Sequence, residues 1–115
     1  ERVIHHEVFH IINDQHKELF NKNKWEKFNH LKFEYAECST CTKKIGLERY
    51  EKTDGFFTEY SKSTASEDMA EVYSHIIYLD PKKINQIRKL DKILDKKISY
   101  IENNIKKIDN SFMFK

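Results

Sequence analysis

Two histidines and a glutamate near the start of the chain are spaced so that they could bind a metal ion. The segment His6-Glu7-Val8-Phe9-His10 has the form HExxH. If this segment is helical, His6 and His10 lie one turn apart on the same face, and both imidazoles can reach one cation. Glu7 then lies beside them, where its carboxylate could take a proton from a metal-bound water. The motif predicts a zinc site with His6 and His10 as ligands and Glu7 as the general base.

HExxH is short enough to occur by chance, so ordinary helix histidines are the alternative interpretation. The surrounding residues favour the metal site. Between residues 3 and 21 the apolar side chains trace two adjacent faces of the predicted helix, which indicates that much of this helix is buried. Buried imidazoles and carboxylates need compensating partners, and a shared cation would supply one.

A catalytic zinc needs three protein ligands and an open position for water, and the sequence offers two sources for the third. His16 extends the motif to HExxHxxNxxH, which is similar to the metzincin pattern with Asn13 in place of the usual glycine. Glu67, on a predicted second helix, is the other candidate. Thr64-x-x-Glu67 is also a capping box, in which the glutamate folds back on the threonine. In that case Glu71, one turn further on, becomes the better ligand candidate.

A second pattern favours Glu67. It consists of a tyrosine, six residues, and then Glu-x-x-Ala-Glu-x-aromatic, and the matching residues are Tyr60, Glu67, Ala70, Glu71 and Tyr73. Together with HExxH it resembles the catalytic domain of gluzincin-type zinc metallopeptidases, namely the anthrax lethal factor-like peptidases, the Pro-Pro endopeptidases and related bacterial zinc-binding metallopeptidases. The resemblance covers roughly residues 2–20 and 55–79.

This resemblance implies a zinc-dependent endopeptidase with a zincin-like catalytic subdomain. Glu67 would be the third zinc ligand, and Tyr60 would donate a hydrogen bond to the oxyanion of the tetrahedral intermediate. Glu71 would accept the second N–H of a ligand histidine. The partner would be a peptide or protein substrate, and a secreted or cell-surface location is favoured. The alternative for Tyr60 is an ordinary core or surface tyrosine.

The elements that must position these residues are mainly α-helical. Only two glycines and one proline occur in 115 residues, so a large antiparallel sheet with tight hairpins is not expected. Apolar spacings predict three principal helices over residues 3–21, 66–79 and 81–109, with a mixed helical stretch over 22–35. On the second helix, we expect Asp68 to be structural and His75 to be solvated.

A loop-rich insertion over residues 36–62 separates the first and second helices. It contains Cys38-x-x-Cys41, which could be half of a structural zinc site, a redox pair, or a local disulfide or two free thiols. No second CxxC and no thioredoxin-like βαβ pattern accompany it. We therefore favour the disulfide or the free thiols.

Length and charge limit the classes of partner. The 21 basic and 19 acidic residues nearly cancel, which gives no reason to expect nucleic acid or an anionic membrane as the main partner. No apolar run approaches the roughly 20 residues that span a bilayer. We expect a single zincin-like domain over 1–115, or the C-terminal part of one. It would hold a zinc-site core over 1–79 and a long C-terminal helix within 80–115.

The resemblance also raises an alternative function. In such peptidases a small sheet precedes the HExxH helix, whereas Glu1 stands five residues before His6. We therefore expect most of the sheet to be lacking and another chain or an N-terminal domain to cover the exposed core. The alternative to a peptidase is a non-catalytic interaction module of the same fold, with or without a structural zinc.

Overall fold

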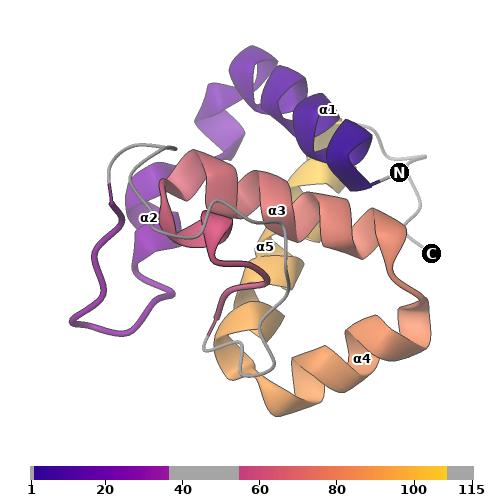
Figure 1. The fold of residues 1–115 in the computed structure, drawn as a ribbon. Coiled ribbons are helices and arrows are strands. Elements are labelled where there is room, and N and C mark those ends of the chain that lie inside the picture. Colours follow the sequence, from indigo (N-terminus) through magenta and orange to yellow (C-terminus); the bar gives the residue numbers. More distant parts are fainter. Residues whose placement is uncertain (1, 37–54, 109–115) are drawn as a thin grey trace.

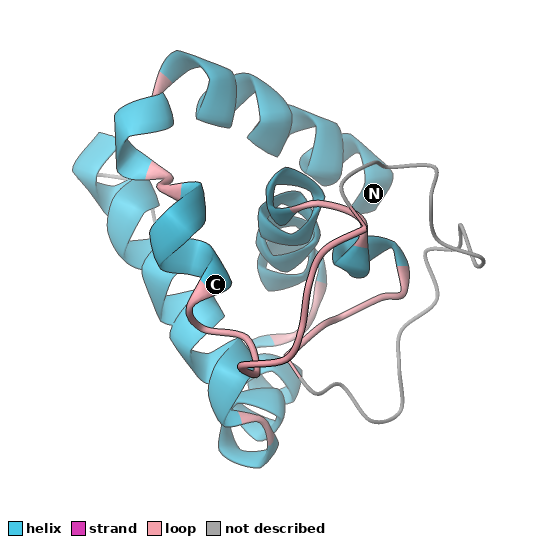
Figure 2. Ribbon diagram, turned by 90° about the vertical axis from the view of Figure 1, so that its left-hand side faces the viewer, coloured by secondary structure: helices cyan, strands magenta, loops and turns pink. Residues whose placement is uncertain are grey.

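A computed structural model describes residues 2–36 and 55–108, and these residues form helices joined by turns and irregular segments (Figures 1 and 2). The α-helices and two short 3-10 helices are α1 (Arg2–Gln15), η1 (Lys17–Leu19), α2 (Lys22–Glu26), η2 (Tyr60–Lys62), α3 (Ala65–Tyr78), α4 (Pro81–Leu90) and α5 (Lys92–Ile108). No strand occurs within the described residues. The predicted mainly-α fold is confirmed, while Cys38 and Cys41 lie outside the described residues.

Helix α3 is the centre of the fold and has more buried residues than any other described helix. It packs against α1 on one side and α5 on another (Figure 1). Ten of its 14 residues are buried. The helix begins after Thr64, whose backbone is extended and whose hydroxyl accepts the Glu67 N–H at 3.1 Å. The cap therefore fixes where α3 starts and, with it, the position of the two glutamates.

Helix α1 lies against α3 through Phe9, which is fully buried and contacts the rings of Phe20 and Tyr73. The helix ends at Gln15, earlier than the predicted residue 21, because the chain leaves helical geometry at His16 (φ −135°, ψ 49°) and turns into η1. This turn brings Phe20 back onto Phe9, with the ring centroids 5.1 Å apart. Burial of these aromatic rings fixes α1 on α3.

The predicted single helix over 81–109 is wrong, because Asp91 divides it into α4 and α5 (Figure 1). Asp91 has an extended backbone, and its Oδ1 accepts the Leu94 N–H at 3.0 Å as an N-cap. Its Oδ2 accepts the Gly55 N–H at 2.7 Å. The apolar stripe survives the break in part, since Ile84, Leu94 and residues further along α5 are buried while Leu90 is exposed.

A buried ion pair between α3 and α5 links several of these helices. Lys97 on α5 and Asp68 on α3 are both fully buried, with Nζ 2.7 Å from Oδ2. The same Oδ2 accepts hydrogen bonds from Trp25 Nε1 and Tyr35 OH, and Lys97 Nζ also donates to the Gly55 carbonyl. Asp68 is structural, as predicted, because it connects α2, α3, α5 and the segment before η2.

One face of α1 is apolar and exposed. Val3, Ile4, Val8 and Ile11 are between 38% and 62% exposed, and no strand among the described residues covers them. The apolar spacing predicts that much of this helix is buried, but within the described residues only His6 and Phe9 of α1 are buried. Among the described helices, none is long and apolar enough to cross a membrane.

Candidate metal centre

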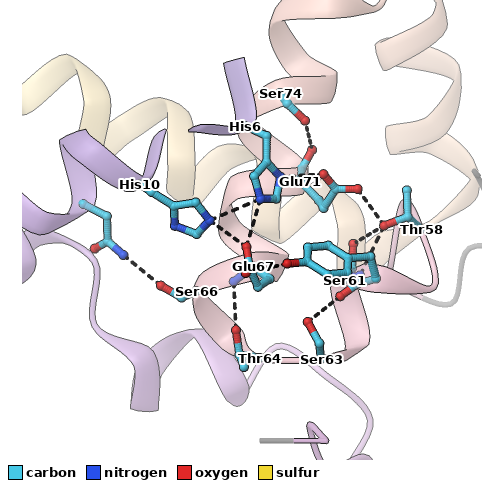
Figure 3. A network of polar contacts seen from close by, with 12 residues as sticks. His6, His10, Thr58, Ser61, Ser63, Thr64, Ser66, Glu67, Glu71 and Ser74 are labelled. Carbon is cyan, nitrogen blue, oxygen red and sulfur yellow. Dashed lines mark hydrogen bonds and ion pairs between the residues drawn. The ribbon is translucent and has the colours of Figure 1, made fainter. Parts of the chain in front are cut away.

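The candidate site lies between α1 and α3. Figure 3 shows His6 and His10 extending from α1 toward Glu67 and Glu71 on α3. The Nε2 atoms of His6 and His10 are 3.1 Å apart. Glu67 Oε1 lies 2.6 Å from the His10 nitrogen and 2.9 Å from the His6 nitrogen. Two imidazole nitrogens and one carboxylate oxygen thus meet at one point, and zinc is commonly held by such a set.

The other ring nitrogen of His6 is held by a buried carboxylate. His6 Nδ1 lies 2.6 Å from Oε2 of Glu71, which is fully buried. A carboxylate only accepts, so Nδ1 must carry the hydrogen. In the neutral ring, Nε2 then keeps its lone pair and directs it toward Glu67 and His10. A carboxylate behind a ligand histidine commonly fixes the tautomer in this way.

This arrangement favours a positive charge between the three facing atoms. If His6 is neutral, its Nε2 lone pair opposes Glu67 Oε1 at 2.9 Å, and two acceptors face each other. Burial disfavours a protonated His6, but its hydrogen bonds with Glu67 and Glu71 prevail and raise its pKa to about 9. A divalent cation bound by the two Nε2 atoms and Glu67 Oε1 would supply this positive charge in place of the proton.

The spacing of the two histidine nitrogens also fits zinc. Two nitrogens that bind one tetrahedral zinc at about 2.0–2.1 Å lie roughly 3.3 Å apart, close to the 3.1 Å between the two Nε2 atoms. Glu67 is half-buried, and although burial opposes its ionisation, hydrogen bonds from His10, His6 and Tyr60 hold its pKa well below the usual range. It is therefore a carboxylate at neutral pH, which is the form that ligates a metal.

Tyr60 contacts the other oxygen of Glu67. Its hydroxyl lies on η2, just before α3, and donates to Glu67 Oε2 at 2.6 Å. Only half of the predicted capping box forms, because the Thr64 hydroxyl accepts the Glu67 N–H while the Glu67 side chain faces the histidines. The phenol is thus at the site rather than in the core or on the open surface.

Of the other two candidate residues, Glu7 lies beside the motif histidines and His16 does not. Glu7 is exposed, and one ligand atom each from His6, Glu7 and His10 lie within 4.8 Å of one another. His16 stands after the end of α1, and its ion pair is with Glu18 at 4.0 Å. The fold therefore brings Glu67, and not His16, against the two motif histidines.

The structure adds two residues that the sequence interpretation missed. Arg2 Nη1 lies 3.2 Å from both oxygens of Glu71, and Thr58 Oγ1 donates to Glu71 Oε1 at 2.7 Å. Arg2 precedes His6 by four residues, so helical spacing could have placed it on the same face. Nothing in the sequence pattern indicates Thr58, whose contact depends on how the segment before η2 folds back.

The prediction of a solvated His75 is wrong. Its side chain is 1% exposed, its Nδ1 donates to the Glu71 carbonyl at 2.7 Å, and its ring stacks on Phe57 with centroids 4.3 Å apart. His75 therefore supports the backbone that carries Glu71 and does not face the candidate metal position.

A match to a known protein family indicates which metal this site could hold. The model of the family described as "Putative zinc-binding metallo-peptidase" matches residues 1–111. The chain belongs to this metallopeptidase family. Comparisons with curated proteins and with solved structures give no match. Zinc is the cofactor that both the family description and the cluster of His6, Glu7 and His10 in this metallopeptidase indicate.

Proposed function

We propose that this member of the zinc-binding metallopeptidase family is an active endopeptidase of the gluzincin type, similar to the lethal factor-like and Pro-Pro endopeptidases. In this proposal His6, His10 and Glu67 hold the zinc. The observation that carries it is the convergence of two Nε2 atoms and Glu67 Oε1, with every pair between 2.6 and 3.1 Å. Three protein ligands leave a position for water or substrate, as catalysis requires.

Each remaining residue then has a chemical task. Zinc bound here would supply the charge that polarises the scissile carbonyl and lowers the pKa of water. Glu7, which is exposed beside the histidines, takes the proton of the attacking water as the new C–O bond forms. It passes that proton to the amine nitrogen as the C–N bond breaks.

Tyr60 is suited to stabilise the oxyanion. Its hydroxyl already lies at the site, where it donates to Glu67 Oε2, the oxygen that does not face the histidines. A small rotation of the phenol would let it donate to the carbonyl oxygen of a substrate as negative charge develops there. Glu71 keeps the His6 ring oriented and is itself held by Arg2 and Thr58.

Peptide hydrolysis by the zinc-loaded protein tests the catalytic part of the proposal. We expect a fluorescein-labelled casein to be cleaved by the wild type and about 100- to 10,000-fold more slowly by Glu7→Gln, because the general base is lost. Zinc content should be unchanged in this variant. Glu26→Gln, an exposed glutamate of α2, is the matched control and should cleave like the wild type. Equal cleavage by Glu7→Gln would contradict the mechanism.

The second candidate function is a non-catalytic interaction module of the same family. The exposed apolar face of α1 formed by Val3, Ile4, Val8 and Ile11 favours it, because such a face suits a covering chain or N-terminal domain. X-ray absorption of the zinc-loaded protein discriminates between the candidates. A water-like oxygen beside three protein ligands favours catalysis, whereas four protein ligands indicate a closed structural site.

A further inference from the structure

A polar cleft of about 940 Å³ opens beside His10. Its walls come from the C-terminal half of α1, the connection to α2, the start of α2 and Ser66 at the start of α3. Of its lining residues, the sequence patterns considered for the metal site name only His10 and Asn13. A cleft of this volume is in the range that binds small ligands or short peptide segments.

The cleft adjoins the candidate metal centre. His10 is common to both, since its Nε2 faces Glu67 while its ring lines the cleft. Asn13 Nδ2 donates to Ser66 Oγ at 3.2 Å, which joins α1 to α3 next to Glu67 (Figure 3 labels Ser66). A peptide with its scissile bond at the metal site would therefore place the residues on one side of that bond in the cleft.

The lining of the cleft is polar and carries one unbalanced positive charge. Three asparagines (Asn13, Asn21 and Asn23) line it. Asn13 Nδ2 donates to Ser66 and Asn21 Oδ1 accepts the Lys24 N–H, so their other amide atoms and the amide of Asn23 are the groups that could bind peptide backbone. Lys17 and Asp14 form an ion pair at 3.5 Å and largely cancel. Lys22 is exposed and has no ion-pair partner among the described residues.

We propose that this cleft binds the peptide segment that flanks the scissile bond and that Lys22 selects an aspartate or glutamate side chain there. The proposal rests on the proposed peptidase function and adds its substrate class. An acidic side chain gains the attraction of the lysine, whereas a basic one is repelled. Since the pair is exposed to solvent, its effect on binding is modest and decreases with added salt.

Binding of a randomised peptide library to the zinc-loaded Glu7→Gln protein tests the charge preference without requiring turnover. Bound peptides are identified by mass spectrometry and compared with the input mixture. We expect acidic residues to be enriched about 3- to 10-fold over basic ones at one position. Adding Lys22→Glu should abolish or reverse that preference. Adding Lys83→Glu on α4, an exposed lysine that does not line the cleft, has the same change in charge and should preserve the preference.

Hydrolysis of the same library by the protein with Glu7 intact distinguishes a failure of the cleft assignment from a failure of the proposed peptidase function. If the library is cleaved but shows no acidic preference, or shows one that Lys22→Glu does not change, the cleft assignment is overturned and the peptidase function stands. Lys22-dependent binding without any cleavage retains the cleft and overturns the peptidase. An equal effect of Lys83→Glu also overturns the assignment, because the preference would then reflect overall charge.

Discussion

His6 Nδ1 lies 2.6 Å from Oε2 of Glu71, a carboxylate that is entirely buried. The contact fixes the tautomer of the ring and leaves the opposite nitrogen free to bind a cation. It also explains why a second glutamate follows Glu67 by one helical turn. One glutamate faces the candidate metal position, and the other holds a histidine in place.

The first prediction concerns Glu71→Gln. The amide can still accept from His6 Nδ1, but it lacks the negative charge that strengthens this hydrogen bond and pairs with Arg2. We expect zinc affinity to fall about 10- to 100-fold, measured by competition with a chromophoric chelator. Glu102→Gln, which weakens an ion pair with Arg88 away from the site, is the control. Unchanged affinity in Glu71→Gln would show that the buried carboxylate does not support the ligand.

The second prediction concerns Tyr60→Phe. The hydroxyl contacts Glu67 Oε2, whereas Oε1 faces the histidines. We therefore expect zinc affinity within about threefold of the wild type but kcat lowered about 10- to 1,000-fold, since one oxyanion donor is lost. Tyr78→Phe, at an exposed position at the end of α3, should change neither quantity. A loss of zinc without a separate loss of kcat would contradict the assigned role.

The third prediction concerns the turn at Gly55. Its φ of +95° disfavours a side chain, and an added Cβ would lie 2.5 Å from Ile93 Cγ2. We expect Gly55→Ala to lower the free energy of unfolding by about 1–3 kcal/mol in urea denaturation. Ile93→Ala removes the Cγ2 atom at 2.5 Å and leaves only Cβ, at 3.1 Å from the added methyl group. If Gly55→Ala costs less stability in the Ile93→Ala background than in the wild type, the difference measures the steric overlap and the remainder measures backbone strain. No loss of stability in Gly55→Ala would contradict the turn as described.

The fourth prediction concerns the buried pair of Lys97 and Asp68. Lys97→Met leaves an uncompensated carboxylate at a fully buried position, and we expect a loss of about 3–5 kcal/mol at neutral pH. Burial already raises the pKa of Asp68 despite the attraction of Lys97. Without the lysine this pKa should rise further.

The pH dependence of that variant follows from the raised pKa of Asp68. A carboxyl with a folded pKa above its unfolded value contributes stability that is present at low pH and is lost as the pH rises through the folded pKa. The stability difference between wild type and Lys97→Met should therefore be smaller near pH 4 than near pH 7. Urea denaturation of both proteins at the two pH values measures it. A difference that grows on acidification would contradict this explanation.

Much of the site could be predicted because its residues lie on helices. Spacings of four residues place His6 with His10, and Glu67 with Glu71, on common helix faces. That the two faces meet is implied only by the resemblance to gluzincin-type peptidases, and the contacts of Glu67 with both histidines agree with it.

The sequence did not predict the remaining features, either because they depend on tertiary packing or because one local pattern obscured another. The break at Asp91 is hidden by apolar residues that continue at helical spacing from Ile84 to Ile108, although an aspartate followed by a new helical segment is a typical N-cap. The Thr58 contact and the stacking of His75 on Phe57 form where the segment before η2 packs on α3. The cleft beside His10 combines residues 10–23 with Ser66 on α3. No local pattern encodes them.

The most direct test of the central claim is the zinc affinity of the wild type, Glu67→Ala and Glu26→Ala, determined by chelator competition together with zinc content per chain. If His6, His10 and Glu67 hold the metal, the wild type and Glu26→Ala should each bind one zinc. Glu67→Ala should bind it at least about 10-fold more weakly, because one of three ligands is lost. Wild-type affinity in Glu67→Ala, or no zinc in any of the three proteins, would contradict the proposed site.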